Sequence, residues 1–138
     1  MDKSDFIDHL NGDLSSEFQS IVQYVQHSAT VKGAEYGSIV AEMGQHLGQE
    51  LEHAKTLAAQ IDFLGGTPSV TVPAVADCPD GAAALKADLE LEERQLDRYR
   101  ARVAEAAELG LPDVAEALRP LLTQTQDHVI DLREALGH

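Results

Sequence analysis

The sequence predicts an all-α fold, a four-helix bundle with a long connection between its second and third helices. Four long segments are rich in Ala, Leu, Glu and Gln, which are strong helix formers. Gly and Pro cluster between these segments, in VKGAEYG, LGGTPSVTVPAVADCPDG and LGLPD. Each segment also carries a row of positions spaced alternately three and four apart, which is the pattern of a helix facing a bundle core. The 138 residues suffice for one such domain with its own core, so we expect a single domain over 1–138.

The first two helices are expected at residues 3–32 and 35–64. The inward row of the first contains Leu10, Leu14, Glu17, Ile21, Tyr24, Ser28 and Val31. The row of the second contains Ile39, Met43, His46, Glu50, His53, Leu57, Ile61 and Leu64. Both rows are apolar at their ends and become polar near the middle. We therefore expect the polar side chains of the middle to point into the bundle.

The third and fourth helices are expected at residues 81–109 and 112–136. Asp80 is placed to cap the third, Pro112 suits the first turn of the fourth, and Pro120 should kink the fourth. Their inward rows are Leu85, Leu89, Glu92, Leu96, Tyr99 and Val103, and Val114, Leu118, Leu121, Thr125, His128, Leu132 and Ala135. Before the third helix lie about 16 residues with no helical pattern, enough to carry the chain along the bundle, whereas short connections make antiparallel neighbours.

The composition excludes several classes of partner. The 24 acidic residues outnumber the 10 Lys and Arg, for a formal net charge of -14, which disfavours nucleic acids and anionic membranes and suits cations such as metal ions. The single cysteine excludes an internal disulfide and fits a reducing compartment. MDKSDFIDHL lacks the pattern of a secretory signal, and no stretch approaches the ~20 apolar residues of a membrane span. We expect a soluble, cytoplasmic protein.

The polar middle of the four rows has the residue types of a metal centre. Unpaired carboxylates in a core cost several kcal/mol each, so they need a compensating charge. In di-iron bundles, one Glu from each of two helices joins a Glu-x-x-His from each of the other two. Carboxylate and imidazole together suit iron. The predicted ligands, which are also the predicted catalytic residues, are Glu17, Glu50, His53, Glu92 and His128. Thr125 stands where the second motif needs its Glu and offers only a water-mediated contact; His46 is a possible extra ligand, or a neighbour of the ligands.

Residues 6–136 resemble a bacterioferritin. The resemblance is carried by LNGDLSSEFQSIVQYVQH at 10–27, ELEHA at 50–54, LKADLELE at 85–92 and QTQDHVIDL at 124–132. It implies a ferritin-like bundle in which Glu17 and Glu92 are terminal carboxylate ligands, Glu50 bridges two metals, and His53 and His128 are the histidine ligands. It also implies a homo-oligomer, at least a dimer.

Four departures from that family limit what the resemblance implies. Thr125 replaces the second bridging glutamate, so the second iron site should be weaker. Leu51 replaces the haem-ligating methionine, so no haem is expected. Gln49 and Gln124 stand where the family often has an Asp that orients a histidine, and they still offer a hydrogen-bond acceptor. The sequence ends two residues after the fourth predicted helix, without the family's fifth helix, which leaves a dimer and a cage both open.

Three functions follow from these observations as alternatives. The first is a ferroxidase, in which a di-iron centre oxidises Fe(II) to Fe(III) with oxygen or peroxide, for iron handling or protection from oxidative stress. The second is a di-iron oxidase or oxygenase that acts on an organic substrate. The third is a non-enzymatic helical bundle that holds one metal ion or none. Metal content and oxygen-dependent loss of Fe(II) distinguish them.

Overall fold

The computed structural model describes all 138 residues and confirms the predicted four-helix bundle. The helices are α1 (Lys3–Thr30), α2 (Gly37–Phe63), α3 (Gly81–Glu108) and α4 (Pro112–Ala135). A 3-10 turn, η1 (Ala34–Tyr36), precedes α2. The second helix therefore begins two residues later than predicted, because Gly33, with φ of 113°, turns the chain and the next residues form the tighter helix first.

The predicted helix starts are present as specific contacts. The side chain of Asp80 accepts a hydrogen bond from the backbone N–H of Ala83 and so caps α3. Pro112 occupies the first turn of α4, where its missing N–H costs no helical hydrogen bond. Helix α4 continues through Pro120, and the kink expected there stays a prediction.

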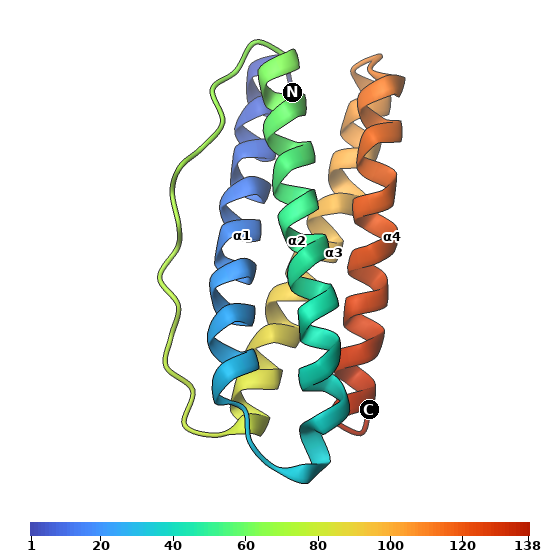
Figure 1. The fold of residues 1–138 in the computed structure, drawn as a ribbon. Coiled ribbons are helices and arrows are strands. Elements are labelled where there is room, and N and C mark those ends of the chain that lie inside the picture. Colours follow the sequence, from blue (N-terminus) through green and yellow to red (C-terminus); the bar gives the residue numbers. More distant parts are fainter.

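The long connection makes α2 and α3 parallel (Figure 1). Helix α1 packs mostly against α2, and α3 mostly against α4, as two antiparallel pairs. Residues 64–80 return along the outside of α1 from the end of α2 to the opposite end of the bundle (Figure 1). A helix of 28 residues is about 42 Å long, and an extended chain advances about 3.3 Å per residue, so residues 64–80 are long enough to span the bundle.

Hydrogen bonds hold this connection against α1. The side-chain amide of Asn11 donates to the carbonyl of Thr67 at 3.0 Å, and its oxygen accepts from the backbone N–H of Ser69 at 2.7 Å. The hydroxyls of Ser15 and Ser69 are 2.9 Å apart. The start of the connection is therefore a bound strap, although it has no regular secondary structure.

The core consists of two apolar clusters with a polar layer between them. One cluster includes Phe6, Leu10, Leu57, Leu118 and other residues from one end of the bundle. The other includes Ile39, Met43, Leu85, Leu132 and others from the opposite end. All eight positions of the row predicted for α2 and all six of the row for α3 are buried, whereas Ile21 and Ser28 of the α1 row and Ala135 of the α4 row are only partly buried. None of the four helices is long and apolar enough to cross a membrane.

Candidate metal centre

Five polar side chains meet in the layer between the two apolar clusters, and they come from all four helices. Each is at most 1% exposed. They are Glu17 of α1, Glu50 and His53 of α2, Glu92 of α3 and His128 of α4. The structure thus brings together all five residues that the sequence predicts to be metal ligands.

The first group of donors contains Glu17, Glu50 and His53, with one ligand atom from each within 4.8 Å of the others. His53 Nδ1 lies 3.6 Å from Glu17 Oε1 and 3.6 Å from Glu50 Oε2. The hydroxyl of Tyr99 donates to Glu17 Oε1 and holds that carboxylate in place. One imidazole nitrogen and two carboxylates therefore surround a common point.

The second group contains Glu50, Glu92 and His128, again with one ligand atom from each within 4.8 Å of the others. His128 Nδ1 lies 2.7 Å from Glu50 Oε1 and 3.5 Å from Glu92 Oε2. The hydroxyl of Tyr24 donates to Glu92 Oε1 at 3.0 Å. Glu50 belongs to both groups, one oxygen facing each histidine, which is the placement of a bridging carboxylate.

Two glutamines orient the histidines from across the bundle. His53 Nε2 of α2 donates to Gln124 Oε1 of α4 at 2.7 Å, and His128 Nε2 of α4 donates to Gln49 Oε1 of α2 at 2.6 Å. Because each Nε2 donates its hydrogen to a glutamine, each Nδ1 is the ring atom that faces the carboxylates, where it holds a proton in the metal-free protein and could instead bind a metal ion. The acceptor role predicted for Gln49 and Gln124 is present.

Without a metal ion, protons balance the charge of this cluster. Burial raises the pKa of Glu17 well above its ordinary value, and the neighbouring Glu50 carboxylate raises it further. Burial alone would lower the pKa of His53, but its contacts with Glu17 and Glu50 outweigh that effect and raise it to about 10. His128 follows the same rule, with Glu50 and Glu92 raising its pKa to about 10. Because both histidines favour their protonated form, the electrostatic potential at this site is strongly negative.

The donor atoms left without partners fit a bound cation. One oxygen of each of the three glutamates, Nδ1 of His53 and the hydroxyl of Thr125 are buried and have no hydrogen-bond partner. Buried polar groups without partners cost about 1–3 kcal/mol each, so such a concentration is unusual in a core that has only a structural role. Three carboxylates and two imidazoles are a donor set suited to iron.

Thr125 and His46, the two further residues that the sequence suggests as possible contacts of the metal, lie beside this centre. Thr125 is fully buried on α4 and contributes no charge. His46 is 3% exposed and its ring stacks on that of His128, with the ring centroids 4.0 Å apart. Burial lowers the pKa of His46, and the charge of His128 lowers it further. The structure places His46 against the centre, and its ring faces Tyr24 and Asp131.

A second set of buried polar residues between α1 and α3 is absent from the predicted rows. His27 Nδ1 donates to the carboxylate of Asp88 at 2.8 Å, and Gln23 Nε2 donates to the same carboxylate at 2.9 Å. Further along, Arg102 Nε donates to Asp13 Oδ2 at 2.7 Å. Burial raises the pKa of Asp13 to about 6 even though Arg102 favours its charged form. These contacts tie α1 to α3 through polar pairs.

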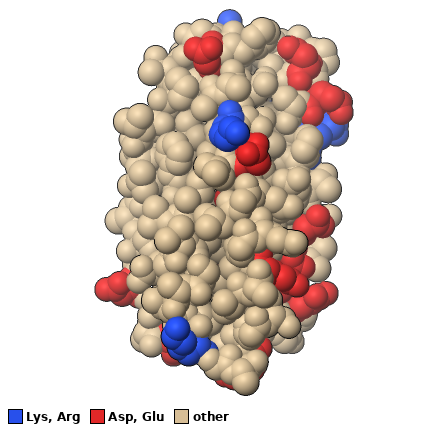
Figure 2. All heavy atoms as spheres, in the orientation of Figure 1, with Lys and Arg blue, Asp and Glu red and all other residues tan.

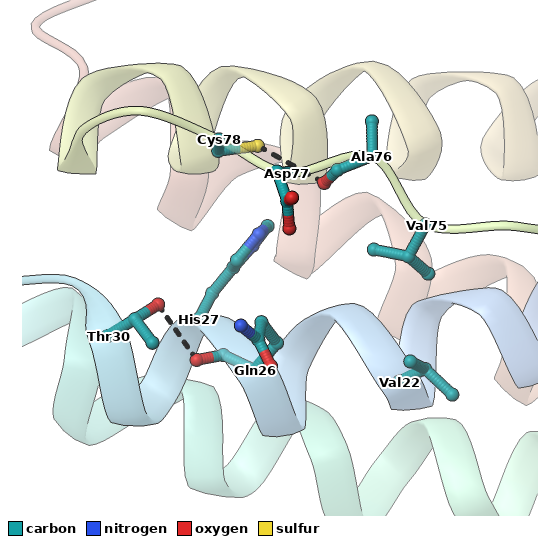
Figure 3. A pocket seen from close by; sticks show the side chains of 8 residues that line it. All are labelled: Val22, Gln26, His27, Thr30, Val75, Ala76, Asp77 and Cys78. Carbon is teal, nitrogen blue, oxygen red and sulfur yellow. Dashed lines mark hydrogen bonds between the residues drawn. The ribbon is translucent and has the colours of Figure 1, made fainter.

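A pocket of about 300 Å³ lies outside His27, between α1 and the end of the connection (Figure 3). Figure 3 shows the His27 ring pointing from α1 towards Asp77 of the connection. The thiol of Cys78 donates to the carbonyl of Ala76 at 3.8 Å in the same pocket. The pKa of Cys78 is raised by partial burial and by acidic neighbours, which keeps it a thiol at neutral pH.

Solved structures with this architecture include a diiron-carboxylate protein and a bacterioferritin. A ferritin-like, diiron-carboxylate protein from Bacillus anthracis has a TM-score of 0.92 and 28% identity, over 99% of this chain and 98% of that one. A Rhodobacter capsulatus bacterioferritin, described with a metal-free dinuclear site and a haem iron, has a TM-score of 0.86 and 25% identity, over 97% and 84%. BfrA from M. tuberculosis shares the fold, with a TM-score of 0.84 and 23% identity, over 94% and 81%.

A search of curated protein sequences found no match. The sequence model of the ferritin family, described as the ferritin-like domain, matches residues 7–138. This match and the solved structures confirm the resemblance noted in the four sequence motifs. Because the match covers nearly the whole chain, the protein belongs to the ferritin family.

Proposed function

We propose that this protein binds iron at the buried centre and oxidises Fe(II) to Fe(III) there. The observation that carries the proposal is the sharing of Glu50 by two groups of donors, each with two carboxylates and one imidazole. The similarity to a diiron-carboxylate protein supports iron as the metal. The proposed ligands, and the residues that carry the oxidation, are Glu17, Glu50, His53, Glu92 and His128.

The residues have distinct roles in this proposal. Glu50 would hold both Fe(II) ions, while Glu17 with His53 and Glu92 with His128 would complete the two sites. Each Fe(II) supplies one electron. Two of them reduce dioxygen to hydrogen peroxide with uptake of two protons, or reduce hydrogen peroxide to two waters with uptake of two protons. Tyr24 and Tyr99 hold the outer carboxylates by hydrogen bonds, so that these ligands stay in place between turnovers.

The two ions should not bind equally well. Three carboxylates face four positive charges when both ions are ferrous, and Thr125 supplies no fourth carboxylate. The ion that arrives second shares Glu50 with the first and is repelled by it. At the buried centre we expect one tight and one weaker ion.

Replacement of Glu50 tests this function. Glu50→Gln should abolish most binding of Fe(II) in an anaerobic titration and most of the ultraviolet absorbance that appears when air is admitted, because both sites lose their shared ligand. Glu52→Gln is the matched control, because Glu52 lies two residues from Glu50 on the same helix and its side chain is 67% exposed. Equal iron binding by the two variants would contradict the proposal. Iron binding without oxygen-dependent loss of Fe(II) would contradict only the ferroxidase activity.

We also propose that the protein forms a homo-oligomer, at least a dimer. Val25 on α1 and Leu51 on α2 are 54% and 52% exposed, so a second copy of the chain packed on these helices would cover apolar surface. The bacterioferritin fold supports self-association.

A further inference from the structure

A second hollow opens directly outside the centre, between α2 and α4. It has a volume of about 280 Å³, and its lining includes His46, Asp131, Asp127 and the outer side of His128. Figure 2 shows acidic side chains gathered on the α4 side of one face of the molecule. The hollow therefore joins solvent to the back of a proposed iron ligand through an acidic wall.

Three donor side chains converge at this hollow. One ligand atom each from Glu42, His46 and Asp131 lies within 4.8 Å of the others. His46 is 3% exposed, the side chain of Asp131 is 34% exposed, and Glu42 is exposed. Two of the donors are thus accessible from solvent, while the third is held in the wall of the bundle.

The hydrogen bonds of His46 leave one ring nitrogen facing a carboxylate. The hydroxyl of Tyr24 donates its single hydrogen to Glu92, so the Tyr24 oxygen acts only as an acceptor towards His46 Nδ1, 3.3 Å away. When the neutral ring carries its hydrogen on Nδ1, His46 Nε2 presents a lone pair towards Asp131 Oδ2, 3.0 Å away, and a cation bound between these two atoms would satisfy both.

We infer that Glu42, His46 and Asp131 bind a third divalent metal ion, separate from the two of the buried centre. A nitrogen and an oxygen 3.0 Å apart have the spacing of neighbouring ligands around an ion at about 2.1 Å from each. One imidazole with two carboxylates suits Fe(II), Zn(II) and Mn(II). Because two of the donors are open to water, this ion exchanges with solvent more readily than ions of the centre.

The third site lies in contact with the centre and shares none of its ligands. The stacked rings of His46 and His128 separate the two, and the hydrogen bond from His46 to Tyr24 continues to Glu92. If the function proposed above holds, an ion at Glu42, His46 and Asp131 is Fe(II) held in reserve for the centre. The binding of the ion itself does not depend on that function.

Calorimetric titration of the metal-free protein with Zn(II) tests the inference. The double variant Glu42→Gln and Asp131→Asn should bind one ion fewer than the parent, because it loses both carboxylates while keeping side chains of the same size. The control is Glu52→Gln with Glu134→Gln, which removes the same charge from exposed positions on the same two helices and should bind as the parent does. Equal stoichiometry in the parent and in the Glu42 and Asp131 variant would overturn the inference.

A Glu50→Gln background separates this inference from the proposed function. In that background one ion should remain, and it should be lost when Glu42 and Asp131 are also changed. If Glu50→Gln removes no ion but the Glu42 and Asp131 variant does, the third site stands and the buried centre does not.

A crystal of the protein soaked in Zn(II) should show anomalous density within bonding distance of His46 Nε2. Anomalous density at the buried centre alone would overturn the third site.

Discussion

Thr125 is the inward residue of α4 at the level of the centre, and it offers a neutral hydroxyl with no hydrogen-bond partner. Thr125→Glu would complete a second Glu-x-x-His with His128 and bring a fourth carboxylate to two divalent ions. We expect the variant to bind the second Fe(II) about tenfold more tightly or better, and to oxidise Fe(II) faster in air. An anaerobic Fe(II) titration followed by absorbance after aeration measures both.

The same substitution should weaken the metal-free protein. Another buried carboxylate without a partner raises the free energy of the folded state, by about 1–3 kcal/mol or more. Thr123→Glu, at an exposed position on the same helix, controls for helix propensity and net charge. If the two ions already bind the centre of the parent protein with equal affinity, another donor completes the second site, and the absence of a carboxylate at Thr125 does not weaken it.

At the residue scale the sequence located the inward polar layer because periodicity reports which side of a helix faces the core. The convergence of Glu17, Glu50, His53, Glu92 and His128 is as predicted, while their role as iron ligands stays a prediction. The pairing of each histidine with the glutamine of the opposite helix was not predictable in detail. Periodicity places residues on a face but does not say which residue of another helix stands opposite.

At the scale of the helices, Arg102 joins α3 to α1 through a buried ion pair. Arg102 is 8% exposed and Asp13 is fully buried. Arg102→Met should destabilise the protein by about 3–5 kcal/mol in urea denaturation, because it removes the hydrogen-bonded partner of the buried Asp13 carboxylate and leaves only Arg98, whose Nη1 lies 3.6 Å from Asp13 Oδ1. Arg100→Met should cost less than about 1 kcal/mol, since the Arg100 side chain is 58% exposed in its pair with Asp97.

Adding Asp13→Asn to Arg102→Met identifies why the Arg102→Met variant loses stability. The double variant should recover part of the stability, because no uncompensated charge remains in the core. A double variant that is less stable than Arg102→Met alone would show that lost packing, rather than the unpaired charge, dominates.

The four helices and the long connection were predictable, with ends displaced by two residues or fewer. The sequence did not predict the polar pairs between α1 and α3, because a charged residue next to an apolar row is normally expected to face solvent. A signal was present: Asp88, Gln95 and Arg102 are spaced seven apart and form a second row along α3. Their burial depends on α1, which carries their partners far away in the sequence.

For the whole molecule, the histidines of the centre predict a dependence of stability on pH in the metal-free protein. The folded-state pKa values of His53 and His128, about 10, lie above the ordinary 6.5. The folded protein therefore binds more protons than the unfolded chain between those values. Stability from this source is complete below pH 6.5 and is lost as pH rises towards 10, by up to about 1.4 kcal/mol per pH unit for each histidine.

Urea denaturation of the metal-free protein from pH 6 to pH 9 measures this decline. The protein loaded with metal should not show it, because the ions replace the protons. The double variant His53→Gln and His128→Gln should also show a flatter profile. A stability that rises with pH over this range in the metal-free parent would contradict the assignment of protonated histidines.

Self-association is a second property of the whole molecule. Leu51→Glu places a charge on an exposed apolar position, so it should shift the protein towards the monomer in light scattering at micromolar concentration. Glu134→Gln, which alters the charge of α4, should leave the oligomeric state unchanged. A monomeric parent protein would contradict the proposed homo-oligomer.

The connection along the outside of α1 divides the chain into two hairpins. Helices α1 and α2 form one hairpin and α3 and α4 the other, so each forms from contacts that are short in sequence, and the strap contributes none of the five central residues. Glu17, Glu50 and His53 belong to the first hairpin, and Glu92 and His128 to the second. Ions at the centre would therefore act as a clamp between the halves. A chain cut within residues 64–80 should therefore hold together best when metal is bound at the centre.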